Sequence, residues 1–231
     1  MFRLFGKGIS SSTSSSLSKL EGLSLLCIAD THRVLNPSEL GILESYRDKV
    51  DLVLTLGDIP VESLKKINGD YGVLGNHDYF GGIESEKNLH LRTINHTTQP
   101  SHPTPHLHLS LGGFEGSSRY KPGRFVMYSQ EESCELLDKL DYCDIFISHD
   151  SCIKEYYKNN LEDIDAHSGL IGIDKYIEEK KPLLHIHGHH HKNEVKYKYG
   201  VPSICVYGIC LVEIKNGLLS VVDLRENKVI L

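Results

Sequence analysis

The sequence predicts one α/β domain built around a large, partly mixed β-sheet, and three observations lead to this prediction. Short apolar runs of strand length alternate with helix signals from residue 23 onward, which is the pattern of an α/β protein. About the last 35 residues carry only strand and turn signals, so further strands are expected there. A chain of 231 residues is also long enough to bury one sizeable core.

The first 22 residues differ in composition from the rest of the chain. Residues 10–16 are six serines and one threonine, a segment that cannot bury enough apolar area to offset the entropy lost on ordering. The segment also lacks the apolar stretch of about 7–15 residues that a secretory signal needs. We therefore expect residues 1–22 to form a flexible Ser-rich arm and residues 23–231 to form the folded domain.

In the first third of the domain, strand and helix signals alternate regularly. Asn36 is a typical helix cap, Pro37 suits the first helical position, and Glu39 stands three residues after the cap. Leu40, Leu43 and Tyr46 continue this helix at helical spacing. The other expected elements are strands over residues 23–29, 51–56 and 71–74 and a short helix over residues 61–67.

A polar stretch without periodicity interrupts the middle of the domain, and strand and helix signals resume after it. Residues 81–106 show no periodicity and are expected to be mostly loop. Ser129 and Glu132 form a capping box, which predicts a helix through residue 140. Asn216-Gly217 predicts a hairpin turn. The remaining elements are strands over residues 107–111, 145–148 and 183–187 and a helix over residues 169–180.

Charge and cysteine usage exclude several classes of protein. The chain has 25 Lys and Arg against 31 Asp and Glu, a net charge of −6, which disfavours non-specific binding to nucleic acid or to an anionic membrane. No apolar run approaches the roughly 20 residues of a membrane span. The six cysteines are scattered, without a Cys-x-x-Cys pair, so we expect reduced core thiols and a cytoplasmic location.

Five predicted strands are each followed by residues of metal-binding type. In open α/β sheets, the loops at the carboxyl ends of strands gather around one crevice, so these five clusters can converge although they are far apart in the sequence. The clusters are Asp30-Thr31-His32, Gly57-Asp58, Gly75-Asn76-His77-Asp78, His149 and Gly188-His189-His190-His191.

The types of these residues narrow the choice of metal. Carboxylates, imidazoles and one carboxamide, without a thiolate, exclude Cys-type zinc and iron–sulfur sites. Several imidazoles disfavour Ca²⁺ and make Mg²⁺ a second choice, so Mn²⁺ is expected first, with Fe, Co²⁺, Zn²⁺ or Ni²⁺ as alternatives. Seven candidate ligands are too many for a single cation that keeps one coordination position open for water or substrate. Two divalent cations about 3.5–4 Å apart, bridged by a carboxylate, fit better.

Two such cations would carry four positive charges, of which Asp30, Asp58 and a bridging hydroxide would cancel three. The site would thus attract anions within an acidic protein, and a dinuclear site with an activated hydroxide suits attack on phosphorus. Each cluster alone has a plainer interpretation, because a single Asp or His after a strand is more often a cap or turn residue. Five His within residues 185–191 can also bind metal adventitiously. All five clusters in order, each after a strand, favour a real site.

The ordered motifs resemble those of the calcineurin-like metallophosphoesterases. That family carries D-x-H, G-D, G-N-H-[D/E], H and G-H-x-H, and this chain has all five in the same order between residues 30 and 191. The resemblance implies an α/β fold that is a four-layer αββα sandwich of two mixed β-sheets flanked by helices. It also implies a dinuclear metal site on one rim of the sandwich.

The resemblance implies a role for each motif residue. Asp58 would bridge the two cations. The other ligands would be Asp30, His32 and His191 for the first cation and Asn76, His149 and His189 for the second. His77 would stabilise the transition state and protonate the leaving oxygen, as the general acid. Asp78 would orient the His77 imidazole and raise its pKa.

Several residues outside the motifs receive weaker expectations. Strand alternation places His185 and His187 on the same face as the two following ligands, if the strand runs straight. His190 is expected to face solvent, and His167 to be a loop residue that borders the substrate at most. We also expect a tightly packed backbone at Gly112-Gly113, a phosphate contact from Arg119, and an open cleft that only residues 80–107 could cover. The chain departs from the family pattern after the lone His149, where Asp150-Ser151-Cys152 stands in place of the Pro-Pro of many members.

These observations together predict a metal-dependent phosphoric-ester hydrolase that acts through attack of a metal-bridging hydroxide. A phosphodiesterase acting on a small phosphodiester is favoured over a phosphomonoesterase. A protein phosphatase, a nuclease and a non-catalytic scaffold on the same fold are the alternatives. The acidic charge disfavours the nuclease, and the retained His77 and ligand residues disfavour the scaffold. The sequence leaves the oligomeric state open.

Overall fold

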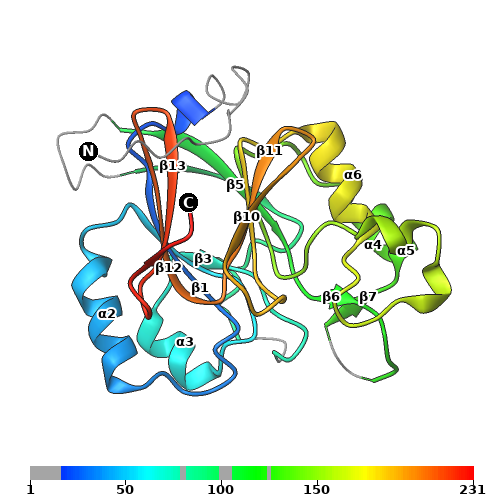
Figure 1. Ribbon diagram of the computed structural model, residues 1–231, viewed down its shortest axis with the longest axis horizontal. Coiled ribbons are helices and arrows are strands. Elements are labelled where there is room, and N and C mark those ends of the chain that lie inside the picture. Colours follow the sequence, from blue (N-terminus) through cyan, green and yellow to red (C-terminus); the bar gives the residue numbers. More distant parts are fainter. Residues whose placement is uncertain (1–16, 79–81, 99–105, 124–125) are drawn as a thin grey trace, which may run out of the picture.

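The computed structural model describes residues 17–78, 82–98, 106–123 and 126–231. Two six-stranded mixed sheets form the centre of the molecule, and helices lie outside them (Figure 1). The α/β class is therefore as expected. The two mixed sheets agree with what the family resemblance implies, whereas the single large sheet expected from the strand pattern is wrong.

The first sheet combines a parallel half with an antiparallel half. β1 pairs in parallel with β2, and β2 with β3, whereas β12, β13 and β14 extend the other side of β1 as an antiparallel meander. The strands in spatial order are β14 (Lys228–Val229), β13 (Leu218–Asp223), β12 (Gly208–Lys215), β1 (Ser24–Ala29), β2 (Leu52–Thr55) and β3 (Tyr71–Gly72). The predicted turn at Asn216-Gly217 joins β12 to β13.

The second sheet has a parallel centre and two antiparallel edges. Its strands in spatial order are β10 (Glu194–Lys198), β11 (Val201–Cys205), β9 (Leu184–His187), β8 (Ile145–Ser148), β5 (His108–Phe114) and β4 (Thr93–Thr97). A small separate sheet contains β6 (Ser117–Ser118) and β7 (Met127–Tyr128). The expectation of a mostly loop-like stretch over residues 81–106 missed β4, whose residues are only partly buried and therefore lack an apolar pattern.

Two helices begin at the caps that the sequence predicts. The expected capping box at Ser129 with Glu132 is present, and the expected cap at Asn36 also forms a capping box with Glu39. The helices are α2 (Pro37–Arg47), α3 (Val61–Ile67), α4 (Gln130–Leu137), α5 (Glu155–Lys158) and α6 (Ile171–Lys180), with 3₁₀ turns η1 (Ser18–Leu20) and η2 (Leu161–Asp163). Within the described ranges, no helix combines the length and the apolar character needed to cross a membrane.

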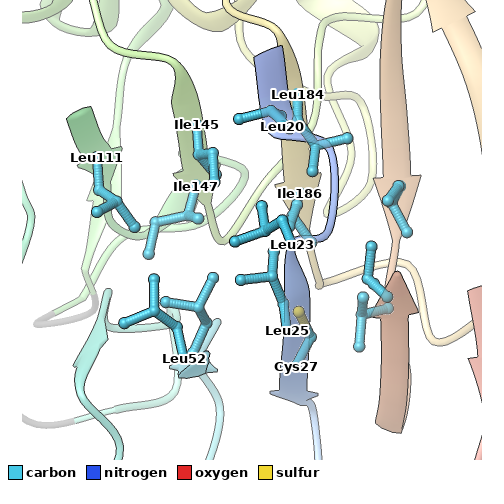
Figure 2. Packing of buried hydrophobic residues seen from close by; sticks show 14 of the residues in the cluster. Leu20, Leu23, Leu25, Cys27, Leu52, Leu111, Ile145, Ile147, Leu184 and Ile186 are labelled. Atoms are coloured by element: carbon cyan, nitrogen blue, oxygen red, sulfur yellow. The ribbon is translucent and has the colours of Figure 1, made fainter. Parts of the chain in front are cut away.

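The main core lies between the two sheets. Figure 2 shows Leu25, Cys27 and Leu52 of the first sheet facing Ile147 and Ile186 of the second. Every residue of β1 is buried, because alternate side chains point to opposite faces of a strand and both faces of this sheet are covered.

Two smaller apolar clusters attach the helices to the outer faces of the sheets. Leu26 and Ile28 of β1 belong to a cluster with residues of α2 and α3. Phe146 of β8 belongs to a cluster with residues of α4 and α6. The order of layers is therefore helix, sheet, sheet, helix, and the four-layer sandwich that the family resemblance implies is confirmed (Figure 1).

The last six residues of the expected N-terminal arm belong to the folded domain. Residues 1–16, with the Ser-rich run, lie outside the described residues, but residues 17–22 pack against the domain. Leu17 and Leu20 are buried in the main core. The carboxylate of Glu21 accepts the backbone N–H groups of Asn216 and Gly217 at 2.6 and 2.8 Å. The boundary at residue 22 was wrong because two leucines at a spacing of three supply apolar area that the serines before them lack.

Candidate metal centre

Loops from both sheets meet at the carboxyl ends of β1, β2, β3, β8 and β9, and backbone hydrogen bonds tie them together. The N–H of Asp30 donates to the carbonyl of Gly57 at 3.0 Å, which joins the loops after β1 and β2. The N–H of Gly188 donates to the carbonyl of His149 at 3.0 Å, which joins the loops after β9 and β8. The clusters that are far apart in the sequence therefore converge at one rim of the sandwich.

Five of the seven candidate ligands have a left-handed backbone. The φ angles are 51° at Asp30, 50° at His32, 55° at Asp58, 68° at His189 and 49° at His191. A positive φ is uncommon for residues with a side chain and carries a conformational cost. The assumption of a straight strand through His191 was wrong, since β9 ends at His187 and the chain then turns twice. Such strain concentrated at one place is typical of a functional site.

The first group of ligand atoms contains Asp30, His32 and His191, which lie within 4.8 Å of one another. The Nε2 atoms of His32 and His191 are 2.9 Å apart, and each lies 3.9 Å from Oδ1 of Asp30. The carboxylate is buried, whereas the two imidazoles are 38% and 47% exposed. This group therefore opens to solvent on the histidine side.

The second group contains Asp30, Asp58 and His149, also within 4.8 Å of one another. Oδ2 of Asp58 lies 3.6 Å from Nε2 of His149 and 3.8 Å from Nε2 of His32. One carboxylate oxygen is thus near an imidazole nitrogen of each group, which is the position that a bridging ligand needs.

Asn76 and His189 complete the second group. Oδ1 of Asn76 lies 3.0 Å from Nε2 of His149, and Nδ1 of His189 lies 3.1 Å from the same atom. All three side chains are buried. The structure therefore brings all seven candidate ligands into one connected cluster.

Backbone carbonyls orient the two buried imidazoles. His149 donates from Nδ1 to the carbonyl of Leu56 at 2.8 Å, which leaves Nε2 with its lone pair facing the cluster. His189 donates from Nε2 to the carbonyl of Ala166, which leaves Nδ1 facing the cluster. The second hydrogen bond of a ligating histidine commonly fixes its tautomer in this way. Neither carbonyl can be identified from the sequence, because any residue supplies one.

The buried carboxylates fit a cation. Oδ1 of Asp30 and Oδ2 of Asp58 are buried, and neither has a hydrogen-bond partner among the described residues. Burial and the neighbouring Asp58 raise the pKa of Asp30 to about 8. Burial opposes ionisation of Asp58 too, but His149, His77 and His32 together lower its pKa. Buried, unpaired carboxylate oxygens are costly unless a proton or a cation neutralises them.

The loop that carries Asn76 is held against the carboxylate of Asp58. Asp78 accepts the N–H groups of Asp58 and Gly75 at 2.8 Å and of Ile59 at 3.1 Å. Asp58 in turn accepts the N–H of His77 at 2.8 Å through Oδ1. A Cβ atom on Gly75 would lie 2.1 Å from that Oδ1, so only glycine fits there. Asp78 therefore positions loop backbone, which the sequence analysis did not foresee, and its effect on the His77 ring stays a prediction.

His77 stands at the edge of a cavity beside this cluster. The residue is exposed, and its ring centroid lies 5.7 Å from that of His32. A cavity of about 340 Å³ is lined by His77, His32 and Asp58 together with residues 59–62, Leu64, Asp78 and Gly82. A substrate in this cavity would contact both the cluster and His77. Residues 80, 81 and 99–105 of the expected cover lie outside the described residues.

The close packing at Gly112-Gly113 is as expected, whereas the contact expected of Arg119 is not. Gly112 and Gly113 lie within β5 rather than after it, and a Cβ on Gly113 would be 2.9 Å from Val73, so the tight backbone is confirmed. The side chain of Arg119 binds the carbonyl of Met127 and the carboxylate of Glu132. A phosphate contact from Arg119 therefore has no support, since its guanidinium is engaged elsewhere.

Of the additional histidines, only His190 is more buried than expected. His185 hydrogen-bonds with Ser148 and Ser203, and it is fully buried. His190 was expected to face solvent, but its side chain is only 9% exposed, because the turn after His189 directs it onto Ser151 at 2.8 Å. His167 is an exposed loop residue whose ring lies 4.9 Å from that of His189.

Asp150, which follows His149 in place of a proline, has a structural role that its position in the sequence did not predict. It is fully buried, and its carboxylate accepts the N–H groups of Ser118 and Ser151 at 3.0 and 2.7 Å. Burial opposes its ionisation, but His189, His190 and the hydrogen bond from Ser118 lower its pKa. Its position next to His149 was the only signal, and a lone Asp after a His is not specific.

The fold and the site define a metal-dependent phosphoesterase, a hydrolase. The family model of the calcineurin-like phosphoesterase superfamily domain matches residues 23–207. The chain therefore belongs to the calcineurin-like phosphoesterase superfamily, whose members depend on a dinuclear metal centre. A comparison with curated protein sequences finds no match.

Solved structures share the fold at low sequence identity. TT1561 of Thermus thermophilus is 14% identical, with a TM-score of 0.57 over 90% of this chain and 97% of the other. GAP50, the anchor in the inner membrane complex of Plasmodium, is 13% identical, with a TM-score of 0.55 over 90% and 87%. A purple acid phosphatase from yellow lupin (Lupinus luteus) is 11% identical, with a TM-score of 0.51 over 90% and 52%.

Proposed function

We propose that this chain hydrolyses a small phosphodiester with the help of two divalent cations. The observation that carries the proposal is the position of Asp58, whose buried Oδ2 lies less than 4 Å from a ligand nitrogen of each histidine group. A carboxylate so placed, without a hydrogen bond to that oxygen from the described residues, suits a bridge between two cations.

The first cation would be held by Asp30, His32 and His191, the second by Asn76, His149 and His189, and both by Asp58. Oxygen and imidazole donors without a thiolate support Mn²⁺ as the first choice, with Fe, Co²⁺, Zn²⁺ or Ni²⁺ as alternatives. When bound, the cations supply Lewis acidity, which polarises a phosphoryl group and lowers the pKa of water.

The residues of this chain then have separate tasks. The two groups of ligands, with Asp58 between them, fix where the phosphorus of the ester lies. His77 borders the cavity 5.7 Å from the His32 ring, so its imidazole can donate a proton to the leaving oxygen. Asp78 keeps the His77 loop in register with Asp58 through its three backbone contacts.

The lining of the cavity supports a diester rather than a monoester. Of the described residues that line it, none is Lys or Arg, and Glu62 adds a negative charge. A monoester carries close to two negative charges at neutral pH, whereas a diester carries one. Ile59, Val61 and Leu64 provide an apolar wall for the second ester group. The expected cytoplasmic location stays part of the proposal, and the six free cysteines support it.

The test compares two chromogenic substrates with the Mn²⁺-loaded full chain. We expect kcat/KM for bis(p-nitrophenyl) phosphate to exceed that for p-nitrophenyl phosphate, and a chelator to abolish both activities. The reverse preference would replace the diesterase with a phosphomonoesterase or a protein phosphatase. A protein that holds two metal equivalents yet hydrolyses neither ester would overturn the proposal in favour of a non-catalytic scaffold.

A further inference from the structure

The outer face of the second sheet changes from apolar to polar along its strands. Near α4 and α6 it presents Phe146 and Val201, which pack in an apolar cluster with those helices. Farther along β9 and β11 the same face presents His187 and Ser203, both largely buried. A buried sheet face in an α/β protein is ordinarily apolar. Here Ser203 bonds to Nδ1 of His185 at 2.8 Å and Nδ1 of His187 bonds to the carbonyl of Gly188 at 3.0 Å, which keeps this part of the face polar.

A cavity of about 200 Å³ covers this polar part of the sheet. Its floor includes His187, Ser203 and Cys205, and residues 151–155 form one wall. Glu194 and residues 196–198 of edge strand β10 also line it. Tyr197, Cys152 and Ile153 add apolar surface, so an organic group can accompany a polar one.

The rim of the cavity is cationic although the chain is acidic. Four lysines line it, Lys154, Lys192, Lys196 and Lys198, against the two acids Glu155 and Glu194. Glu194 holds Lys192 and Lys196 at 2.6 and 3.1 Å, and Asp174 holds Lys198 at 3.0 Å. Glu155 is 78% exposed and pairs with Lys158 outside the lining. Because one carboxylate serves two lysines, the rim keeps a positive excess within a chain of net charge −6.

The chemistry of the lining points to an anion rather than a further metal ion. Among the described residues, only the two groups at the metal centre bring three ligand atoms within 4.8 Å of one another, and neither includes a residue of this cavity. The cationic residues are lysines without an arginine. Lysine binds phosphate oxygens as a compact point charge, so several lysines around one cavity suit a phosphoryl group.

We propose that this cavity binds the phosphoryl group of a small molecule, as a second site beside the metal centre. None of the seven candidate ligands lines it, but three of their close chain neighbours do: Ser151, His190 and Lys192. Ser151 and His190 meet at 2.8 Å between Oγ and Nε2. A ligand in the cavity therefore contacts the same loops that position His149, His189 and His191.

A titration with inorganic phosphate tests the binding site directly. Backbone amide chemical shifts, measured by NMR on the Zn²⁺-loaded full chain, report the two sites separately. The amides of residues 151–155 and 194–198 report the cavity, and those of residues 75–78 report the metal centre. In the wild-type protein, we expect the chemical shifts of the cavity amides to change with added phosphate and to reach a plateau. In Lys154→Gln/Lys196→Gln, the apparent Kd from these amides should rise about fivefold or more, while the titration of residues 75–78 stays unchanged.

The matched control is Lys139→Gln/Lys228→Gln, which removes the same charge from two exposed positions outside the cavity. Shifts confined to residues 75–78, or a control that weakens the cavity titration as much as the cavity variant does, would overturn the proposal. This binding test does not depend on the proposed hydrolysis, so the two proposals can fail separately.

Turnover experiments, which rest on the proposed function, distinguish two sources of the phosphoryl group. If it belongs to the substrate, the cavity variant should raise KM for a diester with a second phosphoryl group and leave KM for bis(p-nitrophenyl) phosphate unchanged. If the phosphoryl group is that of free phosphate, inorganic phosphate should change turnover partly without competing with the diester. The cavity variant should then remove this non-competitive part and leave the competitive part unchanged.

Discussion

Asp58 and Asp78 hold each other's loops in place at the metal centre. Oδ2 of Asp78 accepts the N–H of Asp58 at 2.8 Å, and Oδ1 of Asp58 accepts the N–H of His77, the neighbour of Asp78, at 2.8 Å. This exchange uses one oxygen of Asp58 and leaves Oδ2 facing the histidines of both groups. These backbone hydrogen bonds therefore orient the Asp58 carboxylate so that Oδ2 lies where the proposed bridge needs it.

The substitution Asp58→Asn should remove metal as well as activity. The amide keeps one acceptor for the His77 N–H but lacks the negative charge that two cations would share. We expect fewer than two metal equivalents by elemental analysis and a fall in kcat of at least about 100-fold. Asp138→Asn, at an exposed helix end, is the control. Full metal content in Asp58→Asn would contradict the bridging role.

The substitution His77→Ala should lower kcat while the metal content persists. The imidazole borders the cavity but is not among the ligand groups, so its loss affects proton donation. We expect a fall of about 100-fold or more with an alkyl leaving group and a smaller fall with p-nitrophenolate, which needs little protonation. Equal losses for both leaving groups would count against the general acid.

The substitution Gly75→Ala should destabilise the site through a steric clash. Its Cβ would lie 2.1 Å from Oδ1 of Asp58, and we expect a loss of roughly 1–3 kcal/mol in the free energy of unfolding, together with weaker metal binding. Gly41→Ala in α2 is the matched control, because nothing lies within 4 Å of its Cβ. That change should stabilise by about 0.5–1 kcal/mol. Urea unfolding of both variants measures the contrast.

Removal of metal should lower the melting temperature, because the buried oxygens of Asp30 and Asp58 would lose their cations. Calorimetry before and after a chelator measures the change, and added Mn²⁺ should restore it. Asp58→Asn is the internal comparison, since its melting temperature should respond little to the chelator. An unchanged wild-type melting temperature after verified metal removal would contradict the fit of these carboxylates to cations.

Acid should destabilise the fold through His90, which lies away from the metal ligands. Burial lowers the pKa of His90 to about 4, below its unfolded value of about 6.5. The unfolded chain therefore takes up the proton first as the pH falls, and the stability present above pH 6.5 is lost toward pH 4. Between pH 7 and pH 5 the loss from this residue is on the order of 2 kcal/mol. His90→Gln should reduce the pH dependence of urea unfolding by that amount, and an unchanged dependence would refute the assignment.

The sequence predicted those features that local chemistry determines. The capping boxes at Asn36 and Ser129 fixed two helix starts, and the apolar run over residues 145–148 matched β8 from end to end. The turn at Asn216-Gly217 was visible because that pair favours left-handed φ angles, which the structure has at 54° and 68°.

What the sequence did not predict depends on partners distant in the chain. β4 is an edge strand with polar, partly exposed residues, so it carries no apolar alternation. The carbonyls of Leu56 and Ala166 orient His149 and His189, but a backbone group leaves no mark in a sequence. His190 was misplaced for a different reason, since its direction follows from the left-handed turn at the adjacent His189, a conformation uncommon for a non-glycine residue.

The pairing of β1 with β12 has a consequence for how this protein is made. Residues 24–29 form hydrogen bonds with residues 208–213, so β1 leaves the ribosome long before its antiparallel partner is synthesised. Until then, Leu25 and its neighbours keep one open strand edge, which is the kind of surface that aggregates or recruits chaperones. Completion of the first sheet, and of the rim that carries Asp30, must therefore wait until residues 208–213 have been translated.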